Sequence, residues 1–292
     1  METHVLEYRP KLNDIRSALA NLQGVAEKTP LQHNLFYSNL YHTNIFFKRE
    51  DLQQVRSYKI RGAFNKMSQL SCDEMKKGVV CSSAGNHAQG FALSCSKLKI
   101  RGTIFMPLTT PQQKVQQVEM FGKDWVDIFL IGDTFDHAQE AAQKFCLEND
   151  STFIPPFDDK KVIEGQATIA LELLDKTKDS IDYLIIPVGG GGLAAGLSSV
   201  FNTLSPQTKI IGVEPAGAPS FSKSLKEGKR IRLDEIDKFV DGAAVQEMGG
   251  LTFELCRANV DEILVVDEGL ICKTMLDLYN KNAIVAEPAG AL

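Results

Sequence analysis

The sequence has 292 residues, of which 43% are hydrophobic and 24% are charged, and its formal net charge is −5. A chain of this length and composition can bury a sizeable core and form one large or two medium domains. The acidic balance, with no stretch of Lys and Arg interleaved with aromatic residues, argues against a nucleic-acid-binding protein. No apolar run is long enough to span a bilayer, and the N-terminus lacks a secretory pattern, so we expect a cytoplasmic protein without membrane contacts.

Metal and disulfide chemistry are also disfavoured. The five histidines and six cysteines are widely scattered, without the close pairs that zinc sites and redox motifs require. We therefore expect reduced thiols and no metal centre.

Strand-like and helix-like segments alternate along the chain. By hydrophobic periodicity and end signals, helices are expected at 13–26, 57–67 with Ser57 as its cap, 88–98, after Pro111, 135–147, 163–177, after 192, 220–228 and 270–280. Strands are expected at 45–49, 78–83, 101–106, 125–130, 183–188, 209–213 and 262–266, with a loop at 84–87. This alternation predicts an α/β protein with mainly parallel sheets covered by helices on both faces.

Four consecutive glycines, Gly189, Gly190, Gly191 and Gly192, lie between the apolar segment 183–188 and a helix of small residues. Glycine has no Cβ, so the backbone can adopt positive φ and bring successive N–H groups close to an anion. The start of the following helix adds its dipole at the same place. The stretch therefore predicts a phosphate-binding loop, with a flexible linker as the alternative interpretation.

Three kinds of ligand could bring a phosphate to such a loop. A mononucleotide P-loop requires Lys followed by Ser or Thr after its last glycine, and here Leu193 and Ala194 follow. A dinucleotide fits better, because Gly189, Gly191 and Ala194 match its fingerprint and Glu214 ends the next strand. The third candidate is pyridoxal phosphate, which also requires a lysine that can form a Schiff base.

Lys59 is the candidate lysine, in the first turn of the helix expected at 57–67. A lysine on a helix surface is usually only a solvated charge. Its neighbours Tyr58, Ile60 and Ala63 are largely apolar, however, and burial beside the cationic Arg61 would favour the neutral, nucleophilic amine.

Three segments together resemble a known family: 57–63 (Ser-Tyr-Lys-Ile-Arg-Gly-Ala), 82–90 (Ser-Ser-Ala-Gly-Asn-His-Ala-Gln-Gly) and 188–192 (Val-Gly-Gly-Gly-Gly). They are similar to threonine deaminases of the β-family, or fold type II, of pyridoxal phosphate enzymes. The resemblance extends from about residue 25 to the last residue.

The resemblance implies a role for residues in each segment. Lys59 would form the Schiff base with pyridoxal 5'-phosphate, and Asn86 would hydrogen-bond its 3-hydroxyl group. The backbone of Gly189, Gly190, Gly191 and Gly192, with Leu193, would bind the phosphate. The substrate carboxylate would be held by Ser83, Ala84, Gly85, Asn86 and His87. Gly242 would lie beside the cofactor ring and Glu287 would line the pocket.

The implied reaction is β-elimination of L-threonine to 2-oxobutanoate and ammonia, a step of isoleucine biosynthesis, with L-serine as a possible second substrate. Serine racemases of the same fold are an alternative, but they carry a serine where this chain has Ala84 and an acidic residue where it has Ser220. Glu214 is left as a weak cation candidate. Two further possibilities are a dinucleotide-dependent oxidoreductase and an amino-acid sensor without turnover.

The resemblance also implies two domains of mainly parallel sheet flanked by helices. A small domain, 72–156, would be inserted into a large one, 1–71 and 157–292, with the cofactor between them, and the protein is expected to be a homo-oligomer. We expect the chain to be a truncated form with impaired turnover. The residue at the pyridine nitrogen, and any regulatory domain, would then lie beyond Leu292.

Overall fold

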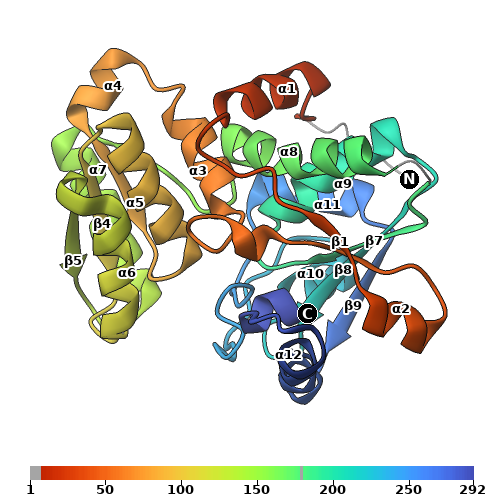
Figure 1. Cartoon of the computed structure of the whole chain (residues 1–292). Coiled ribbons are helices and arrows are strands. Elements are labelled where there is room, and N and C mark those ends of the chain that lie inside the picture. The colour runs from red at the N-terminus through yellow and green to blue at the C-terminus, as the bar shows by residue number, and fades with distance from the viewer. Residues whose placement is uncertain (1–7, 178–179) are drawn as a thin grey trace. The chain divides into compact units, whose positions relative to one another are not determined.

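The computed structural model describes residues 8–177 and 180–292, which divide into two units (Figure 1). The first unit comprises residues 8–15, Lys28–Arg49 and Ala167–Leu292. The second comprises Arg16–Glu27 and Glu50–Gln166. The division falls within two helices, α1 (Leu12–Asn21) and α8 (Lys160–Lys176).

The second unit is built on a parallel sheet with the strand order β5-β4-β3-β6. Residues that alternate along β3 and β4 point to opposite faces of this sheet. Val80 and Phe105 pack with α7 on one face, whereas Cys81 and Ile104 pack with α5 and α6 on the other. The elements of this unit are α3 (Lys59–Met67), α4 (Cys72–Lys77), β3 (Val79–Ser82), α5 (Asn86–Leu98), β4 (Gly102–Met106), α6 (Gln112–Gly122), β5 (Val126–Leu130), α7 (Phe135–Asn149) and β6 (Thr152–Phe153).

The first unit contains a parallel sheet with the order β7-β8-β9 and a small antiparallel pair, β1-β2. Helices α9 and α11 pack against each other beside the parallel sheet (Figure 1). The elements of this unit are β1 (Leu31–His33), α2 (Leu35–Tyr41), β2 (Phe46–Lys48), β7 (Tyr183–Pro187), α9 (Gly192–Leu204), β8 (Lys209–Pro215), α10 (Ser220–Glu227), α11 (Gly250–Asn259), β9 (Glu262–Val266) and α12 (Glu268–Asn282).

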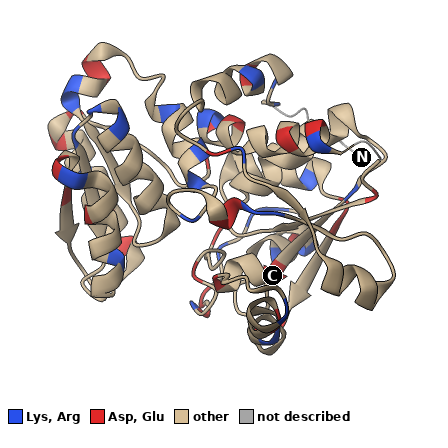
Figure 2. Ribbon diagram, viewed as in Figure 1, with Lys and Arg blue, Asp and Glu red and all other residues tan. Residues whose placement is uncertain are grey.

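The predicted α/β class with mainly parallel sheets is confirmed, and every expected helix and strand is present with small shifts at its ends. The short elements β1, α2, α4 and β6 were not expected, and neither was α11. Positive and negative side chains are interspersed along the helices of both units (Figure 2). Among the described residues, no helix combines the length and the hydropathy needed to cross a membrane.

The start of α3 differs from the expectation. Ser57 does not cap the helix, and its buried hydroxyl has no hydrogen-bond partner within the described residues. Tyr58 already has helical angles (φ −65°, ψ −12°), and the Arg61 amide donates to its carbonyl. Tyr58 therefore leads into α3 with helical geometry, and no side chain of the described residues caps the start of the helix.

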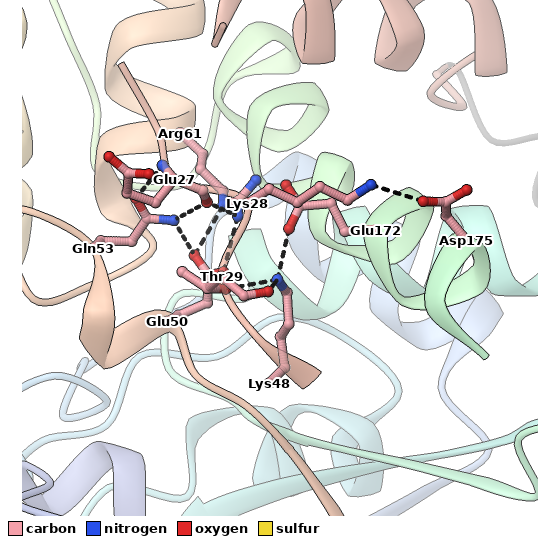
Figure 3. Close-up of polar contacts among 9 residues, drawn as sticks. All are labelled: Glu27, Lys28, Thr29, Lys48, Glu50, Gln53, Arg61, Glu172 and Asp175. Atoms are coloured by element: carbon pink, nitrogen blue, oxygen red, sulfur yellow. Dashed lines mark hydrogen bonds and ion pairs between the residues drawn. The ribbon is translucent and has the colours of Figure 1, made fainter. Parts of the chain in front are cut away.

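Arg61 is held in a buried polar cluster of the second unit (Figure 3). Its Nε and Nη2 atoms donate to the two carboxylate oxygens of Glu50 at 2.8 and 2.9 Å, and Nη2 also donates to the Glu27 carbonyl at 3.0 Å. The Gln53 side chain bonds the Glu27 backbone at both its N–H and C=O groups. A planar guanidinium that meets a carboxylate in this way has its charge compensated and its direction fixed.

Removing one partner of this pair should be costly. We expect Arg61→Met to lower the free energy of unfolding by about 3–5 kcal/mol, because the largely buried Glu50 carboxylate loses the guanidinium that compensates its charge. The double variant Arg61→Met/Glu50→Met should be more stable than the single one. Urea unfolding of both variants measures this. Lys28→Ala, which removes an exposed ion pair with Asp175, is the control and should have no measurable effect. A single variant as stable as the unaltered protein would contradict this expectation.

Glu214 caps helix α10 rather than facing an open site. Its two carboxylate oxygens accept hydrogen bonds from the backbone N–H groups of Phe221 and Ser222, at 2.7 and 2.8 Å. No group of three or more His, Cys, Asp or Glu in the described ranges could hold a metal ion. Burial raises the pKa of the Glu214 carboxyl to about 7, against the opposing effect of the two amide donors.

The raised pKa of Glu214 should make stability depend on pH. The folded protein binds this proton more tightly than the unfolded chain, so the free energy of unfolding should fall as pH rises from about 4.5 through about 7. The loss should reach up to about 3 kcal/mol. Glu214→Gln should remove this part of the pH dependence, as measured by urea unfolding of both proteins between pH 4.5 and 8. Identical pH profiles for the two proteins would contradict the prediction.

Candidate functional site

The glycine loop (residues 189–192) connects β7 to α9 in the first unit. Gly191 has φ +88°, and a Cβ placed on it would lie 2.5 Å from the Cε atom of Met248, so only glycine fits there. The first hydrogen bond of α9 joins the Ala195 amide to the Gly191 carbonyl at 2.8 Å. The N–H groups of residues 191–194 therefore have no acceptor within the helix, and they form the positive end of its dipole.

Gly242 and Glu287, two residues expected at the same site, lie together in the first unit. A Cβ on Gly242 would be 3.3 Å from the Glu287 Oε1 atom and 2.8 Å from the Ala289 Cβ atom. A Cβ on Gly189 would meet the Cα atom of Ala243 at 2.8 Å. The glycine loop and the segment around Gly242 are thus in close contact, which requires the absence of side chains on both.

Two side chains of α11 support the glycine loop from behind, and the sequence did not indicate them. The Thr252 hydroxyl donates to the Gly190 carbonyl at 2.6 Å. The Cys256 thiol donates to the Gly191 carbonyl at 3.6 Å. Their spacing of four residues could have shown that they share a helix face, but not which loop that face contacts.

Lys59 is the first residue of α3 in the second unit and is half-buried. Its Nζ atom donates to the Pro156 carbonyl at 3.0 Å. Helix α5 packs closely against this end of α3, since a Cβ on Gly90 would lie 3.0 Å from the Ile60 nitrogen. The positive charge of Arg61 was expected to favour the neutral form of the Lys59 amine. In the structure this charge is paired with Glu50, which reduces its effect on Lys59.

The asparagine loop (residues 83–87) follows β3 in the same unit. Helix α5 begins at Asn86, two residues earlier than expected, because the Gln89 amide bonds the Gly85 carbonyl at 3.3 Å. Asn86 and His87 consequently lie in the first turn of the helix, where backbone N–H groups have no acceptor within it. No atom lies within 4 Å of a Cβ built on Gly85. The loop therefore combines the amide donors of a helix N-terminus with open space, as an anion site requires.

His87 anchors this loop in a neutral form. Its side chain is buried, and Nε2 lies 2.8 Å from the Ile154 carbonyl. A carbonyl only accepts, so Nε2 carries the proton. Burial, with a smaller contribution from the nearby Lys59 charge, lowers the pKa of His87 to about 3. His87 is thus an uncharged anchor, and segment 154–156 contacts both the asparagine loop and Lys59.

The structure groups the expected site residues in two sets. Lys59 and the asparagine loop, which includes Ser83, Ala84, Gly85, Asn86 and His87, belong to the second unit. The glycine loop, Leu193, Gly242 and Glu287 belong to the first unit. Each set thus brings together residues that are far apart in the sequence.

Comparison with known proteins identifies the family of the chain. The model of the family "Pyridoxal-phosphate dependent enzyme" matches residues 22–292. A biosynthetic L-threonine dehydratase IlvA from Halalkalibacterium halodurans is 51% identical over 282 residues, which cover 97% of this chain and 68% of the relative.

Solved structures give the same result. The processed form of threonine deaminase isoform 2 from Solanum lycopersicum has a TM-score of 0.89 and 41% identity, covering 98% of this chain and 84% of that one. Maize serine racemase has a TM-score of 0.92 and 31% identity, covering 97% and 85%. These neighbours share the fold type II architecture expected from the sequence. The family match and the half-identical relative show that this chain belongs to the family of pyridoxal-phosphate dependent enzymes.

Proposed function

We propose that this protein is an L-threonine deaminase that forms 2-oxobutanoate and ammonia, with L-serine as a second substrate. The observation that supports this most directly is Lys59 near the asparagine loop, with the amine and the amide donors in one compact unit. The relatives named biosynthetic threonine dehydratase are about half identical to this chain. The family match favours this function over a dinucleotide-dependent oxidoreductase.

The residues present fit pyridoxal phosphate. The unpaired amides at the start of α9, and the glycines whose Cβ atoms would clash, match a bound phosphate. Two buried hydroxyls near the other proposed contacts, those of Ser57 and Ser82, have no partner among the described residues. We propose that the glycine loop and Leu193 bind the phosphate, that Lys59 bonds the aldehyde carbon, and that Asn86 contacts the ring. Gly242 and Glu287 would line the same pocket.

The chain's own residues then have distinct tasks. When bound, the cofactor supplies an electron sink for the charge that develops at the substrate Cα. Lys59, once its amine is released, removes the proton from Cα, and the Pro156 carbonyl orients the amine through its hydrogen bond. The amides of the asparagine loop bind the substrate carboxylate. His87 takes no proton at neutral pH and keeps the loop in place through Ile154.

Racemisation is the less favoured reaction. A racemase needs a proton donor on the opposite face of the substrate, and the methyl group of Ala84, which stands where the racemases carry a serine, cannot move a proton. Ser220 likewise offers no carboxylate next to Glu214, whose oxygens are already engaged by α10. A homo-oligomeric state, a cytoplasmic location and the domain boundaries at 72 and 156 stay predictions.

The role of Lys59 is testable by absorbance. The full chain with added pyridoxal phosphate should show the visible band of a lysine-linked cofactor, and Lys59→Ala should abolish it, because no other amine takes its place. Lys66→Ala is a matched control, since Lys66 is also a half-buried lysine of α3 and is paired with Asp159 at 2.7 Å. The control should keep the band. A band that survives in Lys59→Ala would contradict the assignment.

The reaction itself is tested by product analysis. The protein should convert L-threonine to 2-oxobutanoate and ammonia, and Lys59→Ala should lower kcat by about 10³-fold or more, because the base is lost. The measurement is 2-oxo acid formation, followed with L-threonine and then with L-serine, together with chiral analysis of the remaining serine. Formation of D-serine without 2-oxo acid would favour a racemase, and cofactor binding without any product would favour a sensor.

A further inference from the structure

Thr252 and Cys256 contact the side of the glycine loop that carries its carbonyl groups. Both are fully buried and lie one turn apart on α11. The Thr252 hydroxyl is 2.6 Å from the Gly190 carbonyl oxygen but 3.3 Å from that of Gly249. A hydroxyl has one proton to donate, so the shorter contact with Gly190 is the principal bond.

These contacts determine where the loop's N–H groups point. In a trans peptide the C=O of one residue and the N–H of the next lie in one plane and point in opposite directions. When Thr252 holds the Gly190 carbonyl toward α11, the Gly191 N–H must point away from α11. The Cys256 contact with the Gly191 carbonyl does the same for the Gly192 N–H. Two successive amides are thereby turned to the same side of the loop.

Glycine makes such support necessary. A peptide between glycines rotates more freely than any other, and four in succession have no side chains to fix them. Helix α11 supplies the missing restraint by filling the space behind the loop. A Cβ on Gly191 would lie 3.0 Å from the Cβ atom of Thr252. The loop thus rests directly on α11, and its backbone orientation depends on that helix.

The two donors differ in strength. Burial raises the pKa of the Cys256 thiol, so the sulfur keeps its proton and remains a donor. A thiol donates weakly, whereas a hydroxyl donor at 2.6 Å makes a full hydrogen bond. Thr252 should therefore contribute most of the restraint and Cys256 a smaller part.

We propose that Thr252, assisted by Cys256, is a positioning residue that turns the amides of the glycine loop toward the phosphate of pyridoxal phosphate. This inference rests on the proposed phosphate-binding role of the loop. Thr252 itself does not contact the cofactor. It acts only through the Gly190 carbonyl.

The test compares two ligands that differ only in the phosphate. The full chain and its variants are titrated with pyridoxal phosphate and with pyridoxal, and the phosphorus-31 resonance of the bound phosphate is recorded. Thr252→Val keeps the shape but removes the hydroxyl, and Thr252→Ser restores it. Thr274→Val is the control, because its exposed hydroxyl bonds the Leu270 carbonyl within α12, away from the loop.

We expect Thr252→Val to bind pyridoxal phosphate about 10-fold more weakly, with a shifted phosphorus resonance and unchanged affinity for pyridoxal. Thr252→Ser and Thr274→Val should behave like the unaltered chain. Unchanged affinity for pyridoxal phosphate in Thr252→Val, or equal losses for both ligands, would overturn the proposal.

Cys256→Ala provides an independent test if Thr252→Val does not fold. It should weaken pyridoxal phosphate about 2-fold to 3-fold without affecting pyridoxal, because only the weak donor is lost. No difference between the two ligands in this variant would count against the proposal. Failure of the unaltered chain to bind pyridoxal phosphate would instead overturn the proposed function, and this role with it.

Discussion

Both candidate anion-binding loops, one in each unit, depend on the unpaired amides at the start of a helix. An α-helix cannot satisfy its first N–H groups internally, and it concentrates positive potential at that end. The chain uses this twice, at α9 after the glycine loop and at α5 after the asparagine loop. In both places a parallel strand ends directly before the loop, so the strand fixes the position of the amides. Under the proposed function, the two loops recognise a phosphate and a carboxylate mainly through backbone amides and need few charged side chains.

Lys59 lies in a different kind of surrounding, in which the neighbouring basic side chains are either paired with a carboxylate or neutral. Arg61 lies two residues from Lys59, yet its guanidinium is paired with Glu50 and the Glu27 carbonyl. His87 is held neutral by burial and by its bond to Ile154. Neither Arg61 nor His87 therefore presents an uncompensated positive charge to the Lys59 amine.

Elements with a strong local sequence pattern were predicted, whereas elements that depend on contacts with distant parts of the chain were missed. β9 was expected at its observed bounds because Glu262 is followed by four apolar residues, three of which are β-branched. Helix α11 was missed, since two glycines at its start and a mixed composition give little periodicity. The Ser57 cap was wrong because Tyr58, the residue after it, precedes α3 and already has helical angles, which no local sequence signal reveals. Lys59 and the glycine loop were identified from residue types and family resemblance, whereas Thr252 needs the packing of α11 to be recognised.

The difference between motif residues and supporting residues has a physical basis. A motif residue such as Gly191 is restricted at its own position, by a positive φ and by the lack of room for a Cβ, so its identity is visible in the sequence. A supporting residue such as Thr252 is restricted only by the groups that face it, and serine or threonine within a helix often bonds the helix's own backbone instead. The Thr252 hydroxyl lies 3.3 Å from the Gly249 carbonyl, just before its own helix, and 2.6 Å from the Gly190 carbonyl in the loop, and only these distances identify Gly190 as the principal acceptor. The proposed function thus depends on two kinds of residue: those fixed by their own backbone conformation, such as Gly191, and those placed against them by the packing of the fold, such as Thr252.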